Sequence, residues 1–175
     1  MLIPVLMVRD MPNCLCLSAI CAMGLAAAFN AEAASCTYER AHYTYTSDHA
    51  FTASFVKLPP TVDYLGDLGL VLDVRGSHAY AFVIDGGSRF TRLAIPVPLT
   101  GPDAWTIEEG KPGVPGLREM DFHQWSGDKL LDTIPKTGAQ APEVLFMPAL
   151  DESLRHNSAG PIKPPPGFFR LSHCG

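Results

Sequence analysis

Three polar side chains on neighbouring segments are the best candidates for acid–base chemistry. Asp73 stands near the end of an apolar stretch, and His78 and Tyr80 follow shortly after Gly76-Ser77. A two-residue loop with glycine first, as a type II′ turn requires, would pair Asp73 with Tyr80 across a hairpin and leave His78 near its end. A carboxylate, an imidazole and a phenol in one place could transfer protons in a small hydrolase or lyase. The same residues could equally form an ordinary cross-strand polar network.

Two cysteines near the ends of the chain are the second chemical feature. After residue 33 the cysteine count falls from five to two, Cys36 and Cys174. An even pair in an oxidising compartment predicts a disulfide, and closing so long a loop contributes about 4 to 5 kcal/mol in the chain-entropy model. His173 beside Cys174 raises the alternative of a Cys-His nucleophile. Neighbours on a strand point to opposite faces, which favours the disulfide.

Familiar catalytic motifs are poor matches. Residues 126–129 read S-x-x-K and residues 136–138 read K-T-G, as in serine penicillin-binding enzymes, but the two stand too close together for that fold. The six histidines show neither H-E-x-x-H nor H-x-H spacing, and no glycine-rich phosphate-binding motif occurs. We therefore expect no metal and no cofactor, and the sequence favours a non-catalytic protein over an enzyme.

A glycine- and proline-rich segment, residues 101–117, predicts a long surface loop of the kind that carries binding residues. Within it, Trp105 is a candidate anchor, and Glu108, Glu109 and Lys111 are charged neighbours that complete a candidate binding loop. The alternative is a solvated insertion. Further aromatic candidates for recognition, which could instead pack at the ends of the fold, are Tyr38, Tyr43, Tyr45, Trp125, Phe168 and Phe169.

The elements that must position these residues are mostly strands. Alternation across residues 38–58 predicts a hairpin whose loop at residues 47–49 pairs Tyr45 with Phe51 and Tyr43 with Ala53. The next hairpin, from Leu68 onward, pairs Leu72 with Ala81 and is apolar on both faces, so a helix or long loop should cover its back. Further strands are expected at residues 89–97, 119–125, 129–134, 144–147 and 168–174, with a brief helix at residues 148–156.

These elements predict a mainly β fold: an antiparallel meander or sandwich-like single domain with long Gly/Pro-rich loops and at most one short helix. An uncharged run at residues 14–29 precedes Ala31-Glu32-Ala33, which has the small-x-small form of a signal peptidase site. We therefore expect residues 1–33 to be a cleaved secretion signal and residues 34–175 to be the domain. The run is shorter than the roughly 18 to 20 residues that span a bilayer, so no stable membrane span is expected after cleavage.

Composition narrows the function classes. The chain has 175 residues, of which 47% are hydrophobic, enough to build a packed core. Its net charge of −5 gives no basic footprint, so a nucleic-acid partner is not expected. The sequence predicts a secreted, periplasmic or extracellular protein, and a non-catalytic binding or inhibitory module acting on an envelope protein or a cell-wall glycan. The alternatives are a hydrolase or lyase built around Asp73, His78 and Tyr80, and a structural envelope component.

Overall fold

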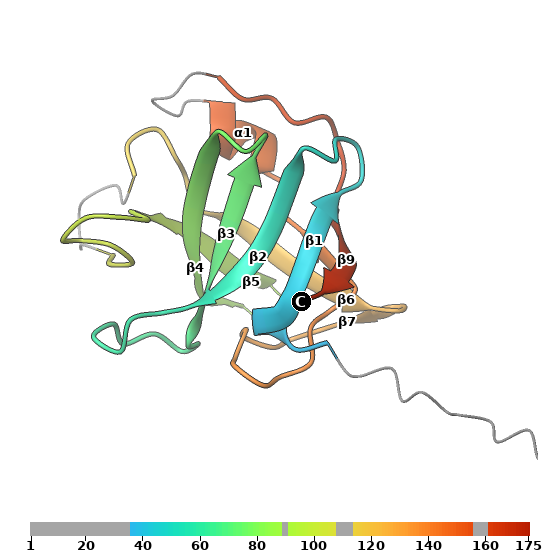
Figure 1. The fold of residues 1–175 in the computed structure, drawn as a ribbon, viewed down its shortest axis with the longest axis horizontal. Helices are drawn as coiled ribbons and strands as arrows, with labels where there is room; N and C mark the ends of the chain where they lie inside the picture. The colour runs from blue at the N-terminus through green and yellow to red at the C-terminus, as the bar shows by residue number, and fades with distance from the viewer. Residues whose placement is uncertain (1–35, 89–90, 108–113, 156–160) are drawn as a thin grey trace, which may run out of the picture. The chain divides into compact units, whose positions relative to one another are not determined.

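The fold is an antiparallel β-barrel with one short α-helix over one end (Figure 1). The computed structural model describes residues 36–88, 91–107, 114–155 and 161–175. Within them the strand order is β5-β4-β3-β2-β1-β9-β8-β6-β7, and a β5–β6 pairing closes the sheet. The elements are η1 (Tyr38–Arg40), β1 (Ala41–Tyr45), β2 (Phe51–Lys57), β3 (Leu68–Val74), β4 (His78–Ser88), β5 (Thr91–Val97), β6 (Met120–Ser126), β7 (Lys129–Leu130), β8 (Val144–Phe146), α1 (Leu150–Arg155) and β9 (Phe169–Cys174). The mainly antiparallel β fold is confirmed, and one sheet curls into a barrel where two could have stacked as a sandwich.

The first hairpin, β1 to β2, has the register that the sequence predicts. Tyr43 pairs with Ala53, and the rings of Tyr45 and Phe51 lie 5.9 Å apart between centroids. All four side chains are buried. Asp48 anchors the loop, because its main-chain oxygen accepts the N–H of Phe51 at 3.0 Å. The predicted pairing is therefore confirmed, and the structure places this aromatic row inside the barrel.

The second hairpin, β3 to β4, differs by one residue from the prediction. Leu72 pairs with Tyr80 and not with Ala81. Because side chains alternate between faces along a strand, this slip turns Tyr80 into the barrel and leaves Asp73 on the outer face. Because of this change of face, Asp73 and Tyr80 of the candidate acid–base cluster lie on opposite sides of the sheet.

The turn itself explains the slip. Arg75 and Gly76 both have positive φ, 57° and 63°, the combination that a type I′ turn requires at its two central residues. The N–H of Ser77 donates to the oxygen of Val74 at 3.1 Å, while the ladder begins one residue later with the pairing of Val74 and His78. Ser77 is thus an extra residue between turn and ladder, and the expected type II′ turn with glycine first is wrong.

Large apolar side chains fill the barrel interior. Leu70, Phe82 and Leu145 are 0% exposed, and the inward rows of β1 to β6, β8 and β9 contribute to one continuous cluster. Its largest fully buried members are Tyr38, Tyr43, Phe82, Phe122, Phe169, Leu68, Leu70, Leu72, Leu145 and Leu154. Burial of this apolar surface is the main term that stabilises the fold.

A smaller apolar cluster lies on the outer face of the second hairpin and its neighbours. Ala81, Val83, Val97 and Trp105 form its buried part. The predicted covering of both faces of this hairpin is therefore confirmed, and the cover comes from the segments that follow β2 and β5.

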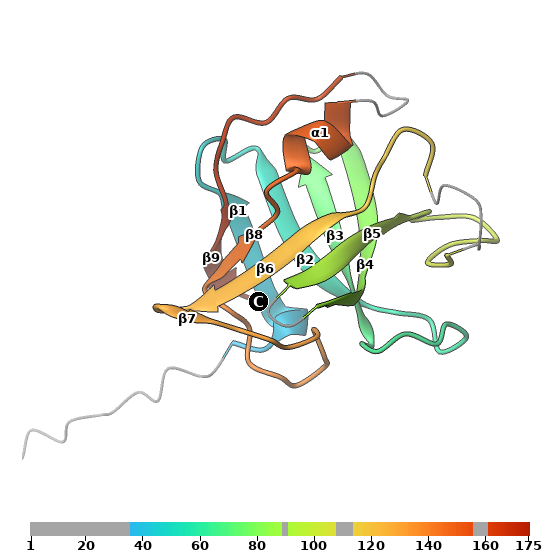
Figure 2. The same ribbon diagram turned by 180° about the vertical axis from the view of Figure 1, so that it is seen from behind.

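Both ends of the barrel are closed by short segments (Figures 1 and 2). At one end lies α1, within the range where the sequence predicts a brief helix, and its Leu150 and Leu154 are buried one helical turn apart. At the other end lie η1 and the chain that follows β7. Strand β7 covers only Lys129–Leu130 and does not extend through residue 134 as the sequence predicts. β5 pairs with β6 only at residues 92–94, so the pairing with β6 ends before Pro96. This end of the pairing is expected, because proline cannot donate a ladder hydrogen bond.

Candidate functional site

The predicted disulfide joins the two ends of the described barrel. Cys36 and Cys174 are bonded, with their Cα atoms 5.7 Å apart. The bond fixes β9 beside η1 and β1, where Ala41 pairs with Cys174. It is consistent with an oxidising, periplasmic or extracellular compartment. Residues 1–35 lie outside the described residues, so the signal sequence stays a prediction.

The candidate acid–base residues are not brought together. Asp73 lies opposite Ala79 on the outer face, and its carboxylate accepts the N–H of Gly76 at 2.7 Å to hold the turn. Tyr80 is buried within the barrel, and burial raises the pKa of its phenol. His78 is exposed at the start of β4, where its Nδ1 lies 2.9 Å from the Ser77 hydroxyl. The expected Asp73–Tyr80 neighbourhood is wrong, because the type I′ turn shifts the register by one residue.

Trp105 is a packing residue and not an exposed anchor. Its side chain is 7% exposed, and it lies against Gly69, where a Cβ would come 2.2 Å from Cζ3 of the indole. The N–H of Trp105 donates to the oxygen of Pro98 at 2.8 Å, and the Tyr64 hydroxyl donates to the oxygen of Trp105 at 3.0 Å. The other three candidates in this loop, Glu108, Glu109 and Lys111, lie outside the described residues.

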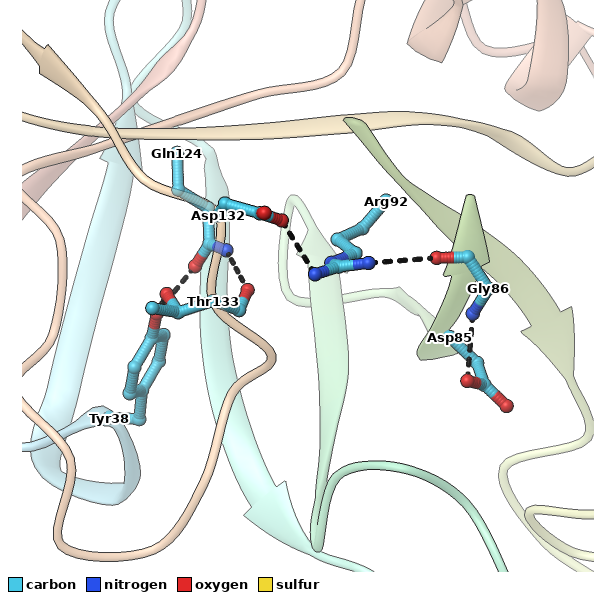
Figure 3. A network of polar contacts seen from close by, with 7 residues as sticks. All are labelled: Tyr38, Asp85, Gly86, Arg92, Gln124, Asp132 and Thr133. Carbon is cyan, nitrogen blue, oxygen red and sulfur yellow. Dashed lines mark hydrogen bonds and ion pairs between the residues drawn. The ribbon is translucent and has the colours of Figure 1, made fainter. Parts of the chain in front are cut away.

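A polar network closes the end of the barrel near η1 (Figure 3). The Tyr38 hydroxyl donates to Oε1 of Gln124 at 2.6 Å, and Nε2 of Gln124 donates to the oxygen of Thr133 at 2.7 Å. Gln124 is 1% exposed, and burial raises the pKa of the Tyr38 phenol. Because the buried amide is satisfied on both sides, this network fits a structural role.

Next to it, Arg92 and Asp132 form an ion pair with Nη2 and Oδ1 2.6 Å apart, also drawn in Figure 3. Nη1 of Arg92 reaches the oxygen of Gly86 at 3.5 Å, a long contact. Asp85 turns its carboxylate to the N–H of Gly86 and not to the arginine. The arginine is thus held by one carboxylate at the rim of the barrel.

The described surface carries one aromatic cluster on the outer side of β6 and β8. Ring centroids lie 5.7 Å apart between His123 and Trp125, 6.2 Å between Trp125 and Phe146, and 6.3 Å between His123 and Phe146. All three side chains are partly exposed. The pairings His123–Phe146 and Trp125–Val144 place them in two rows across the strands.

The neighbouring strand β9 extends one of these rows, because Arg170 pairs with Val144. Leu145 pairs with Phe169, and the partly exposed Phe168 directly precedes the strand. The guanidinium of Arg170 lies 5.5 Å from the centroid of the Phe168 ring. We call this surface the aromatic face; it consists of His123, Trp125, Val144, Phe146, Phe168 and Arg170.

The strand alternation of β6 is the sequence signal for this face. Met120, Phe122 and Gln124 point inward, as expected, and so His123 and Trp125 point outward. Of the aromatic candidates drawn from the sequence, Trp125 and Phe168 are partly exposed, while the tyrosines of β1 and η1 and Phe169 are in the core. Phe146 was missed as a candidate, because a short apolar run does not show which of its faces is open.

Two further searches bear on function. No helix among the described residues is long and apolar enough to cross a membrane. Comparisons of the chain with protein-family models, with curated proteins and with solved structures found no match, so its function has to be argued from the geometry of the barrel alone.

Proposed function

We propose that this protein is a non-catalytic binding module that captures a protein partner on the aromatic face. The observation that carries the proposal is the set of rings on the adjacent strands β6 and β8, with Trp125 and Phe146 at its centre and Arg170 of β9 at its border. Tryptophan and arginine are enriched among the residues that dominate binding energy in protein interfaces. A rigid sheet presents them with little conformational entropy left to lose.

The filled interior of the barrel supports an external site. Barrels that carry small molecules enclose a cavity, whereas here Phe82, Phe122 and Phe169 occupy the interior at 0 to 1% exposure. A ligand of any size would have to displace these rings. Binding energy therefore has to come from the outer surface.

The ring orientations favour a protein over a glycan. The plane of Trp125 is tilted by 40° from that of His123 and by 53° from that of Phe146, so the three do not form a flat platform for a row of sugar rings. Val144 lies between Trp125 and Arg170 in the sheet, and Asp121 and Arg170 are exposed. An apolar centre with a charged border is the anatomy of a protein–protein interface.

The disulfide supports a partner in the same oxidising compartment. With the predicted signal sequence, this compartment is the periplasm or the exterior, and the partner is an envelope or secreted protein. Inhibition of that partner is the specific form of binding that the sequence suggests. The alternative hydrolase or lyase has less support, since its three residues do not meet.

The test uses the oxidised protein as bait in extract from the same compartment, beside Trp125→Ala and Phe146→Ala variants. The matched control is Leu65→Ala, which removes a large apolar side chain that is 60% exposed away from the aromatic face. We expect one protein to be captured by the native chain and by Leu65→Ala but lost from both aromatic variants. Each variant must first show a native melting temperature, because the two rings also pack on the sheet.

Two outcomes would overturn the proposal. A protein captured equally by all four baits would place the interface elsewhere. Retention of the native chain on insoluble cell-wall glycan, lost in Trp125→Ala, would show that the aromatic face recognises sugar in place of a protein.

A further inference from the structure

Two histidines far apart in the sequence meet on the outer side of the barrel. His42 of β1 and His173 of β9 are direct cross-strand partners. Their rings are parallel within 8°, with centroids 4.5 Å apart, and both residues are exposed. The two imidazoles are therefore neighbours that water and ions can reach.

A bulge in β9 produces this alignment. The register shifts between His42 and Tyr43, so that Tyr43 pairs with Leu171 while His42 pairs with His173. Ser172 is the extra residue. Bulges often redirect a side chain, and here the extra residue brings the imidazole of His173 over that of His42.

Hydrogen bonding at the bulge assigns the proton of His173. The Ser172 hydroxyl donates its single proton to the oxygen of His42 at 2.8 Å. Nδ1 of His173 lies 3.2 Å from the same hydroxyl oxygen, so the ring must be the donor in that contact. In the neutral imidazole with this contact, Nε2 carries the lone pair, and an N–H held on the opposite nitrogen is the usual support of a metal-binding imidazole.

Nε2 of His42 lies beside a residue without a side chain. A Cβ at Gly175 would come 3.1 Å from that nitrogen and 3.5 Å from Cδ2 of the same ring. The N–H of Gly175 donates to the oxygen of Arg40 at 2.8 Å, which fixes its position. Any larger residue at 175 would crowd the nitrogen that has to bind the ion.

We propose that His42 and His173 form a bidentate site for a divalent transition metal, with Cu²⁺ bound most tightly and Zn²⁺ less so. Imidazole nitrogen is a preferred ligand of both ions, and Cu²⁺ leads the divalent first-row series. The stacked rings hold their lone pairs in parallel planes, so the exposed His42 side chain has to rotate to turn its lone pair toward an ion held at Nε2 of His173. The described residues hold no group of three or more His, Cys, Asp or Glu around a common point, so water completes the shell.

Metal binding needs no further reactant, because each imidazole donates a lone pair and any imidazolium first releases its proton to solvent. Acid therefore weakens the site. The proposal is independent of the partner proposed for the aromatic face, because it rests on different residues and on a metal ion alone as ligand.

The test is titration of the oxidised full chain with CuCl₂ and with ZnCl₂, followed by calorimetry. Loss of either histidine converts a chelate into a single contact, so His42→Ala and His173→Ala should each weaken Cu²⁺ binding by about 100-fold. Ser172→Ala keeps both ligands but removes the acceptor for Nδ1–H, and we expect a loss of about tenfold. His49→Ala, which removes an exposed histidine from the loop between β1 and β2, should bind as the native chain does.

A spectroscopic measurement completes the test. The electron paramagnetic resonance spectrum of the Cu²⁺ complex should show two imidazole nitrogens in the native chain and one in each single histidine variant. Native affinity in both histidine variants, or a spectrum without coupled imidazole, would overturn the proposal. Thermal melting of the metal-free variants shows whether a loss of binding reflects a loss of fold.

Discussion

Replacing Gln124 by leucine should destabilise the barrel by about 2–4 kcal/mol, although leucine is a good core residue. Gln124 is 1% exposed and makes two hydrogen bonds, one to Tyr38 and one to Thr133. Leucine removes both, and each buried group left without a partner costs roughly 1–3 kcal/mol. Part of the cost is recovered, because the Tyr38 hydroxyl keeps its contact with the hydroxyl of Thr133 at 3.3 Å and leucine adds apolar contact.

Urea unfolding followed by fluorescence measures this change. For a small domain, the expected loss corresponds to a midpoint lower by roughly 1–2 M. Tyr38→Phe alone leaves Oε1 of Gln124 unpaired, whereas in the double variant that oxygen is gone. The double variant should therefore lose less than the sum of the single losses, by at least about 1 kcal/mol. Additive losses, or a leucine variant as stable as the native chain, would refute the view that this network closes the barrel end.

Three further results are expected. The disulfide spans 138 residues, so Cys36→Ala combined with Cys174→Ala should lower the free energy of unfolding in urea by about 5 kcal/mol, and an unchanged midpoint would contradict this. Burial raises the pKa of all five tyrosines above about 10, so the folded state holds their protons more tightly than the unfolded state. The free energy of unfolding should therefore be constant just below pH 10 and fall above it, less steeply in Tyr43→Phe. Unfolding curves measured from pH 8 upward would contradict this reasoning if they showed no such fall. Gly69→Ala should push Trp105 from its place and cost about 1–3 kcal/mol, with a red shift of tryptophan emission; native emission and stability would show that the ring has room.

Local patterns predicted the fold well where turn and alternation agree. In the first hairpin a slip of one residue would put Phe51 on the opposite face from Tyr43 and Tyr45, so burial and loop length favour the observed register. The second hairpin is apolar on both faces, so burial does not distinguish two registers that differ by one residue. The conformation of the turn then determines the register. It requires a positive φ at Arg75, and because arginine rarely adopts a positive φ, the sequence does not indicate it.

The candidate site residues also divide into those placed by local alternation and those placed by contacts between distant segments. The outward position of Trp125 follows from alternation within β6, a local property. The burial of Trp105 depends on the space over Gly69 of β3, and the meeting of His42 with His173 depends on the pairing of the first and last strands. Contacts between segments so distant in the chain produce no periodic pattern in the sequence, so they are seen only in the folded barrel.

Strand β9 links the two proposed binding surfaces. Its residue Arg170 and the preceding Phe168 belong to the aromatic face, and His173 forms half of the proposed metal site. Cys174 follows directly and is held to Cys36, so the disulfide fixes the strand on which both surfaces depend. The interior of the barrel is occupied by its own side chains, which is why both proposals place binding on the outer surface. If they hold, the packed core and the disulfide act as a rigid support for exposed residues of β6, β8, β9 and β1.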